Sequence, residues 1–267
     1  PLGPQSVVSA NEEPYTGIGT LASVEAGVIA DAVVLLEPTE LDLLVGGVGI
    51  LWLEFAVEGR AAHAEAAGSA VSAIDAMLPL LQALRDLERE LNVTGDARIH
   101  KPDPLHVNVG RIAGGDWASS VPSIARLHVR VGFPATWTPA DAERYVRDHI
   151  GTALASDPWL AEHPPLITAN GFRASGYDLA DDHPLVSVLA GAHRDAHGSD
   201  AAPVVMATTT DARTYLGRAD VPALCYGPRT TRIHGIDEGV ELSSIVAGAR
   251  TLARFLAAAP TALTMDR

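Results

Sequence analysis

The sequence predicts an α/β protein in which an antiparallel α/β module is inserted into a parallel α/β domain built from both chain ends. Continuous apolar runs near the ends, at residues 32–36 and 203–207, are typical of strands buried on both faces of a parallel sheet. In the middle, residues 50–58 alternate apolar and polar side chains, which indicates strands with one wet face. The middle elements follow the order strand, helix, strand, strand, helix, strand, as in the ferredoxin-like split βαβ motif.

The flanking domain is predicted to comprise residues 1–44 and 173–267, and its elements alternate between strand and helix. Asp182 and Pro184 resemble an N-cap and a first helical turn, and the closing helix is expected to turn Ile245, Leu252 and Phe255 inward. The expected elements are strands at 6–9, 32–36, 203–207 and 221–226, and helices at 20–30, after Pro184, near Arg213 and at the C-terminal end.

The inserted module is predicted to span residues 45–172. Its first helix carries apolar residues at three-to-four spacing from Val71 to Leu91, and Pro79 should bend that helix or shift its start. Two alternating strands flank a Gly114-Gly115 turn, and Thr138-Pro139 begins a second helix. The expected strands are 50–58, 106–110, 125–131 and 166–169.

Composition narrows the class of partner. The chain has 267 residues, 33 acidic against 19 basic, and a formal charge of −14, so we expect neither nucleic acid nor a membrane surface as partner. Residues 1–267 show neither an apolar run of membrane-spanning length nor a basic segment before an apolar start. The single cysteine, Cys225, excludes an intramolecular disulfide and favours the cytoplasm. Because the sequence begins at Pro1, we expect a processed, trimmed or partial chain.

Chemistry-bearing side chains follow several of the predicted strands in the flanking domain. Glu12 and Glu13 follow the first strand, Glu37 follows the second, and His234 lies beyond the last. Ligands bind at the carboxyl ends of strands in open parallel sheets, so these residues are candidates for a zinc-type ligand set with a spare carboxylate as base. Taken alone, adjacent glutamates are more often part of a solvated loop.

Several motifs in the same order make the chain resemble the family of acetylornithine deacetylase, succinyl-diaminopimelate desuccinylase, carboxypeptidase G and aminoacylase. This resemblance covers nearly the whole chain. It implies a three-layer α/β/α catalytic domain of the zinc-peptidase type with an inserted lid and dimerisation domain. The motifs are Asn11-Glu12-Glu13, Thr16-Gly17-Ile18-Gly19-Thr20, Asp31 to Glu37-Pro38-Thr39, Gly59-Arg60-Ala61-Ala62-His63-Ala64, Val121-Pro122, Thr210-Asp211-Ala212-Arg213, Tyr226-Gly227-Pro228 and Ile233-His234-Gly235.

The resemblance also implies a role for each matching residue. Glu12 matches the general base, Glu13 and His234 match ligands of one metal ion, and Glu37 matches a ligand of the other. The implied cofactor is two divalent ions, zinc first, with cobalt or manganese as alternatives. His63 matches a lid histidine that, in dimeric members, reaches the partner's site and stabilises the developing oxyanion.

Three further residues are candidates for substrate binding. Arg213 suits bidentate recognition of a carboxylate but equally suits an ion pair with Asp211. Asn108 and Arg130 lie in alternating strands, where they bind substrate or simply occupy the wet face.

The sequence departs from the family pattern at its start and near one motif. The family's first two ligands, a histidine and a bridging aspartate, lie upstream of the Glu-Glu pair, and none of the residues before Glu12 is His, Asp or Glu. Ser119 stands where members often carry Asn. We therefore expect the chain to be a C-terminal portion that is inactive alone and binds fewer metal ions. The expected whole is a homodimeric hydrolase of N-acyl amino acids or small peptides; the alternative is a non-catalytic dimerising homologue.

Three other patterns favour structural explanations. Gly17-x-Gly19-x-x-Ala22 mimics a dinucleotide fingerprint, but the residues before it are irregular where a tight turn is required. His193 and His197 have metal-ligand spacing on a helix, and we expect them to be solvated. Cys225 sits in an apolar strand, which favours a core position over a nucleophile.

Overall fold

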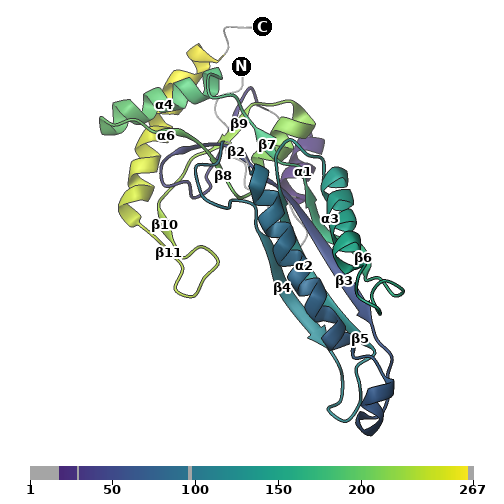
Figure 1. Ribbon diagram of the computed structural model, residues 1–267. Helices are drawn as coiled ribbons and strands as arrows, with labels where there is room; N and C mark the ends of the chain where they lie inside the picture. Colours follow the sequence, from purple (N-terminus) through teal and green to yellow (C-terminus); the bar gives the residue numbers. More distant parts are fainter. Residues whose placement is uncertain (1–17, 29, 96–97, 264–267) are drawn as a thin grey trace. The chain divides into compact units, whose positions relative to one another are not determined.

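Residues 18–28, 30–95 and 98–263 are described by a computed structural model of the chain (Figure 1). Their contacts form two units, which we call the terminal unit and the inserted unit. The terminal unit comprises the chain up to Gly47, the short segment Arg98–His100 and the chain from Tyr177 onward. The inserted unit comprises Val48–Ala97 and Lys101–Gly176. The sequence had placed these boundaries at residues 44 and 172.

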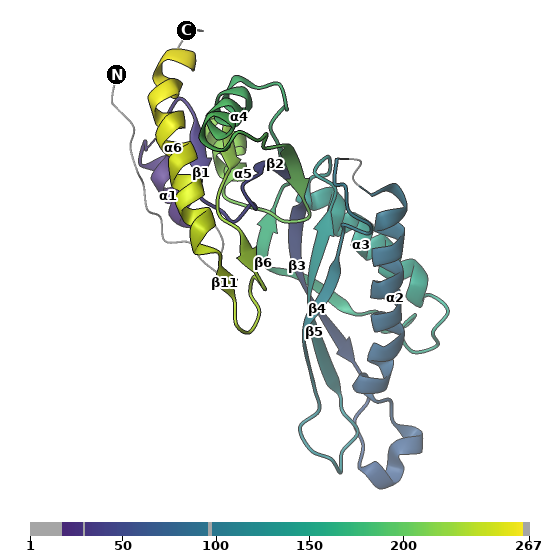
Figure 2. The same ribbon diagram turned by 90° about the vertical axis from the view of Figure 1, so that its left-hand side faces the viewer.

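The inserted unit is a four-stranded antiparallel sheet in the order β4-β5-β3-β6. Helices α2 and α3 pack against each other and cover one face of this sheet (Figures 1 and 2). The predicted order of strands and helices is confirmed. The elements are β3 Gly49–Glu58, η1 Ala64–Ser69, α2 Ala73–Thr94, β4 Val107–Gly114, β5 Ile124–Phe133, α3 Pro139–Leu154 and β6 Leu166–Ala174.

The alternation in β3 produces the predicted two faces. Leu53 and Phe55 are buried beneath the helices, while Glu54 lies on the opposite face. Helix α2 begins after the N-cap Ser72 and continues through Pro79. Helix α3 begins with a reciprocal capping box between Thr138 and Asp141. Local signals thus specify the starts of both helices that cover the sheet.

The described part of the terminal unit contains a five-stranded mixed sheet, whereas the sequence predicted a parallel one. Strand β1 is parallel to β9 and β2 is parallel to β8, but β2 is antiparallel to both β9 and β7. The sequence did not predict β2, because Gly46 and Gly47 give it weak strand propensity. Gly47 is required there, since a Cβ atom would lie 2.3 Å from the Thr208 carbonyl oxygen. The strands are β1 Val33–Leu35, β2 Leu43–Gly47, β7 Tyr177–Asp178, β8 Pro203–Met206 and β9 Ala223–Cys225.

Helices on both faces of this sheet give the predicted three layers. Leu43 and Val45 face the layer of α4 and α6, and Leu44 faces the layer that includes α5 and Val24 of α1. The remaining elements of the unit are α1 Ile18–Glu25, α4 Pro184–His197, α5 Ala212–Thr214, η2 Tyr215–Ala219, the hairpin β10 Thr230–Thr231 and β11 Gly239–Val240, and α6 Leu242–Ala262.

Three expectations about this unit need correction or lie outside the described residues. Helix α1 ends at Glu25 rather than at residue 30, because the chain turns at Gly27 with φ 81°. Ile245 was expected to face inward but is 45% exposed, since α6 buries its small residues against α4 instead. The strand expected at residues 6–9 lies outside the described residues. The buried residues of α6 are Ser244, Gly248, Thr251 and Phe255.

Among the described residues, helix α6 is long and apolar enough, by length and composition, to cross a membrane. This differs from the expectation that the chain contains no apolar run of membrane-spanning length. One side of α6 packs against α4 within the core of the terminal unit, as the core helix of a folded domain does. Length and apolar composition therefore do not identify α6 as a membrane span.

Candidate functional site

Glu37 follows β1 and lies beside the end of β9, its parallel neighbour. Burial and the nearby Asp211 carboxylate raise the pKa of Glu37. Among the described residues, Glu37 has no cationic partner. A partly buried carboxylate beside a second carboxylate is a position that a bound cation would stabilise.

Gly227 allows the chain after β9 to approach Glu37 closely. A Cβ atom at Gly227 would lie 2.2 Å from the Glu37 carbonyl oxygen. The Gly227 N–H donates to Thr39 Oγ1 at 3.0 Å, and its carbonyl accepts from the Leu41 N–H at 2.9 Å. These contacts hold the segment that carries Glu37 against the segment that leads toward His234.

Asp211 is held by partners from two elements. It accepts from Thr20 Oγ1 of α1 at 2.5 Å and pairs with Arg213 Nη1 at 3.2 Å. Arg213 Nη1 also donates to the Thr210 carbonyl oxygen at 3.1 Å. The structure therefore shows the ion pair with Asp211, one of the two alternatives for Arg213, while substrate binding by Arg213 stays a prediction.

Cys225 is a core residue, as the sequence predicted. Its thiol donates to Thr210 Oγ1 at 3.2 Å, and Thr210 also hydrogen-bonds the Tyr177 hydroxyl at 2.7 Å. Burial raises the pKa of Cys225 to about 12, so the thiol stays protonated near neutral pH.

His234 lies in the loop between β10 and β11 and is exposed. Its backbone has φ 59°, and its N–H donates to Glu238 Oε1 at 3.2 Å. Arg232 and Asp237 in the same loop also have positive φ, at 56° and 59°. Such backbone conformations cost energy in non-glycine residues, and they often occur at functional loops.

The described ranges contain no group of three or more His, Cys, Asp or Glu side chains arranged to hold a metal ion. In these ranges, Glu37 and His234 are therefore not part of a cluster with a third metal-ligating side chain. The other predicted residues, Glu12 and Glu13, lie outside the described residues. The carboxylate of Glu37 and the imidazole of His234 are nevertheless ligand types that divalent zinc takes.

The open face of the inserted sheet brings Asn108 and Arg130 together. Asn108 of β4 and Trp52 of β3 are the cross-strand partners of Arg130 on its two sides. Burial lowers the pKa of Arg130, which has no acidic partner among the described residues. Its neighbours on β5, Arg126 and His128, both contact Glu54, at 3.5 and 3.3 Å. Arg130 is thus the arginine of this strand whose charge is not compensated.

His63 lies at the N-cap of η1, exposed to solvent. Its Nδ1 accepts a hydrogen bond from the Glu65 N–H at 3.2 Å. The neutral ring consequently carries its proton on Nε2, which can donate outward. The backbone N–H of Ala64, the residue after His63, donates to the Ser119 carbonyl oxygen at 3.0 Å. The segment that contains Ser119 therefore lies beside His63.

The expectation that His193 and His197 are solvated is wrong for His193, which is 6% exposed. His193 Nδ1 lies 2.7 Å from the Tyr226 hydroxyl, and His197 Nε2 lies 2.9 Å from Thr251 Oγ1. Tyr226 also donates to Thr251 at 3.0 Å. The pair joins α4, α6 and the end of β9 through one polar network.

Sequence reasoning missed the proximity of Asp211 to Glu37 and of Trp52 to Arg130. Both depend on pairing between distant segments. The alternation of β3 and β5 shows which side chains share a face, but not the register that makes Trp52 the partner of Arg130.

Comparison with known proteins gives related enzymes over most of the chain. Residues 45–158 match the peptidase dimerisation domain of the M20 family. The chain is 25% identical over 270 residues to N-formyl-4-amino-5-aminomethyl-2-methylpyrimidine deformylase of Halalkalibacterium halodurans, covering 94% of this chain and 62% of that protein. It is 30% identical over 227 residues to a probable carboxypeptidase of Aspergillus terreus, covering 80% of this chain and 47% of that protein.

The fold is also similar to that of a solved enzyme. The M20 family metallo-carboxypeptidase of Sulfolobus solfataricus aligns with a TM-score of 0.65 and 14% identity, over 90% of this chain and 67% of that one. The chain thus spans less than two thirds of the length of the curated relatives named above. The match of residues 45–158 to the M20 peptidase dimerisation domain, together with relatives across most of the sequence, makes the chain similar to enzymes of the M20 peptidase family.

Proposed function

We propose that the protein containing this chain is a metal-dependent hydrolase that cleaves the amide bond of N-acyl amino acids or small peptides. The names of its relatives, a deformylase and carboxypeptidases, support hydrolysis of amide bonds. The single observation that carries the substrate class is Arg130, partly buried and without an acidic partner among the described residues. This guanidinium beside Asn108 suits the carboxylate of an amino acid.

The pair of Arg130 and Asn108 favours a substrate like that of a carboxypeptidase over one like that of the pyrimidine deformylase. The pyrimidine named in the deformylase carries no carboxylate, whereas every substrate of a carboxypeptidase does. A guanidinium left uncompensated in a partly buried position costs free energy, and a bound carboxylate removes that cost. We therefore assign the chain a carboxylate-bearing substrate.

The metal-binding residues in this proposal are Glu13, Glu37 and His234, with the missing histidine and bridging aspartate supplied by a preceding part of a longer protein. When bound, two divalent ions lower the pKa of a water molecule and polarise the scissile carbonyl. Glu12 would then take the proton from the attacking water, and His63 would donate its Nε2 proton toward the oxyanion that develops in the partner subunit's site. Zinc, cobalt and manganese all fit these oxygen and nitrogen ligands.

The substrate assignment is tested by replacing Arg130 with methionine in the protein that carries this chain. Loss of a charge-assisted bidentate contact should raise KM for N-acetyl amino acids by roughly tenfold to a hundredfold. KM for the matching carboxamides should not change. The matched control is Arg126→Met, which removes an arginine four residues away on the same face whose charge Glu54 already compensates. Equal effects of both variants would contradict the assignment.

We also propose that the protein is a cytoplasmic homodimer formed through the inserted unit, as the match to a dimerisation domain suggests. Strand β4 lies at one edge of the sheet and is mostly exposed over its eight residues. Beside it, Ile74 and Leu78 of α2 are 42% and 62% exposed, and Ile74 lies next to Gly114 at the end of β4. An open edge next to apolar side chains is a surface that a second copy can pair with.

Light scattering of Leu78→Asp tests this interface. The variant should be monomeric where the parent is dimeric, and Leu166→Asp on β6, the opposite edge strand, should stay dimeric. A dimer lost only in the β6 variant would place the interface at the other edge. A dimer without any hydrolysis in the metal-loaded longer protein would support the alternative, a non-catalytic dimerising homologue.

A further inference from the structure

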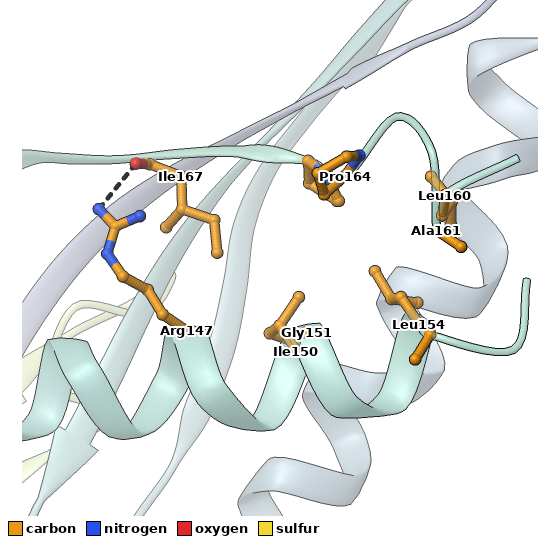
Figure 3. Close-up of a pocket in the computed structure, with 10 residues that line it drawn as sticks. Arg147, Ile150, Gly151, Leu154, Leu160, Ala161, Pro164 and Ile167 are labelled. Carbon is orange, nitrogen blue, oxygen red and sulfur yellow. Dashed lines mark hydrogen bonds between the residues drawn. The ribbon is translucent and has the colours of Figure 1, made fainter.

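The helical side of the inserted unit contains a pocket that the proposed hydrolytic site does not use. It lies between the second half of α3 and the segment that leads into β6, and its volume is about 340 Å³ (Figure 3). That volume is at the lower end of the range for small-molecule sites. Asn108 and Arg130, in contrast, lie on the sheet face opposite the helices.

The walls of this pocket are apolar. Ile150 and Leu154 come from α3, and Leu160 and Pro164 approach from the opposite side (Figure 3). Gly151 also lines the pocket from α3, and a Cβ atom there would meet no other atom within 4 Å. The interior therefore suits an aliphatic group.

One end of the pocket is positively charged. Arg147 Nη2 donates to the Ile167 carbonyl oxygen at 2.8 Å and to Glu143 Oε1 at 2.7 Å. No acceptor for Arg147 Nη1 is found among the described residues, and Figure 3 shows the second terminal nitrogen of this guanidinium on the side of the pocket. An adjoining hollow of about 270 Å³ shares Arg147 and is lined as well by Arg144 and Arg173 and by the carboxylates of Glu143 and Asp148. Arg144 also pairs with Asp141.

Glu143 is shared between two guanidinium groups. Its two oxygens accept from Arg147 and from Arg173, the latter at 2.6 Å, so one carboxylate faces two guanidinium groups. A carboxylate that binds the remaining Arg147 nitrogen, Nη1, would not have to displace Glu143. A purely apolar ligand would make no hydrogen bond to this guanidinium nitrogen.

We propose that this pocket binds an amphipathic carboxylate, with the carboxylate on Arg147 and an aliphatic chain along α3. The pocket runs from Arg147 to Leu154, roughly 10 Å at the rise of an α-helix, which an extended chain of about eight carbons spans. An apolar cavity with one charged end discriminates such a ligand from short carboxylates and from uncharged chains of the same length.

Calorimetric titration of the full chain with octanoate tests this site, with octanol and acetate as comparison ligands. Octanoate should bind about tenfold more tightly than octanol, because only the carboxylate pairs with the guanidinium, and acetate should bind too weakly to detect. Arg147→Met should remove the preference for octanoate over octanol. Absence of octanoate binding at millimolar concentration would overturn the proposal.

A variant whose added side chain occupies the pocket tests directly whether octanoate binds there. Gly151→Leu adds a side chain at a residue that lines the pocket, and its Cβ atom would meet no other atom within 4 Å. Leucine also improves helix propensity, so the variant should fold and lose octanoate binding. Gly191→Leu on α4 makes the same change at a helical glycine with equally open surroundings, and it should bind octanoate like the parent. Unchanged binding in Gly151→Leu would refute the site. Binding lost in Arg130→Met instead would show that octanoate occupies the proposed substrate site.

Discussion

The close approach of Gly227 to Glu37 leads to the most demanding prediction about the terminal unit. In Gly227→Ala the new Cβ atom would lie 2.2 Å from the Glu37 carbonyl oxygen and 3.0 Å from the carbonyl carbon. These are backbone atoms, so no side-chain rotation relieves the overlap. The two segments must separate by about 0.8 Å before this contact reaches the 3.0 Å that real Cβ atoms respect.

That separation acts on the hydrogen bonds that join the segments. The Gly227 N–H to Thr39 bond and the Leu41 N–H to Gly227 bond, now 3.0 and 2.9 Å long, would both stretch. Each is worth roughly 1 kcal/mol net, and a buried group left without a partner costs roughly 1–3 kcal/mol. We expect the free energy of unfolding of the terminal unit to fall by about 2–4 kcal/mol, or roughly 4–16 °C in Tm.

Differential scanning calorimetry of the metal-free chain measures this loss. Gly191→Ala is the matched control, because its Cβ atom meets nothing within 4 Å and should stabilise α4 by about 0.5–1 kcal/mol. A Gly227→Ala variant that unfolds within about 0.5 kcal/mol of the parent would refute the claim that this junction requires glycine.

Three other perturbations test the remaining parts of the fold. Burial lowers the pKa of His193 below its usual 6.5, so protons bind preferentially to the unfolded chain. The free energy of unfolding should therefore fall as pH decreases below that value. Urea unfolding measured at about pH 7.5 and at about pH 5.5 should show a smaller loss of stability in His193→Gln than in the parent. Thr138→Ala removes the capping box of α3 and should cost about 1 kcal/mol by urea midpoint; no change would contradict its role. Phe55→Ala empties a fully buried site in β3 and should cost about 3–5 kcal/mol by chemical denaturation, whereas a loss below about 1 kcal/mol would contradict its core position.

The inserted unit was predictable because its signals are local. Alternation in β3 shows which side chains are buried, and Thr138 with Asp141 marks a helix start. Neither depends on which strands become neighbours. The order of elements, together with these signals, was enough to predict the sheet with helices on one face.

The terminal unit was less predictable because its pattern depends on long-range contacts. Strand β2 ends in Gly46 and Gly47, which contact Tyr177 and Thr208 from far along the chain. The inward face of α6 is made by small residues such as Gly248, whose burial no hydrophobic period indicates. Arg130 was recognisable as a candidate, but its lack of an acidic partner depends on strand register.

Turnover by the metal-loaded protein that carries this chain is the measurement that bears most closely on metal-dependent hydrolysis of N-acyl amino acids or small peptides. We predict that removing the metal with a chelator abolishes release of the free amino acid and that added zinc restores it. Glu12→Gln should retain the metal, measured by mass spectrometry, and lose turnover. Full turnover in Glu12→Gln, or none in a parent that binds its full complement of metal, would show that the proposed function is wrong.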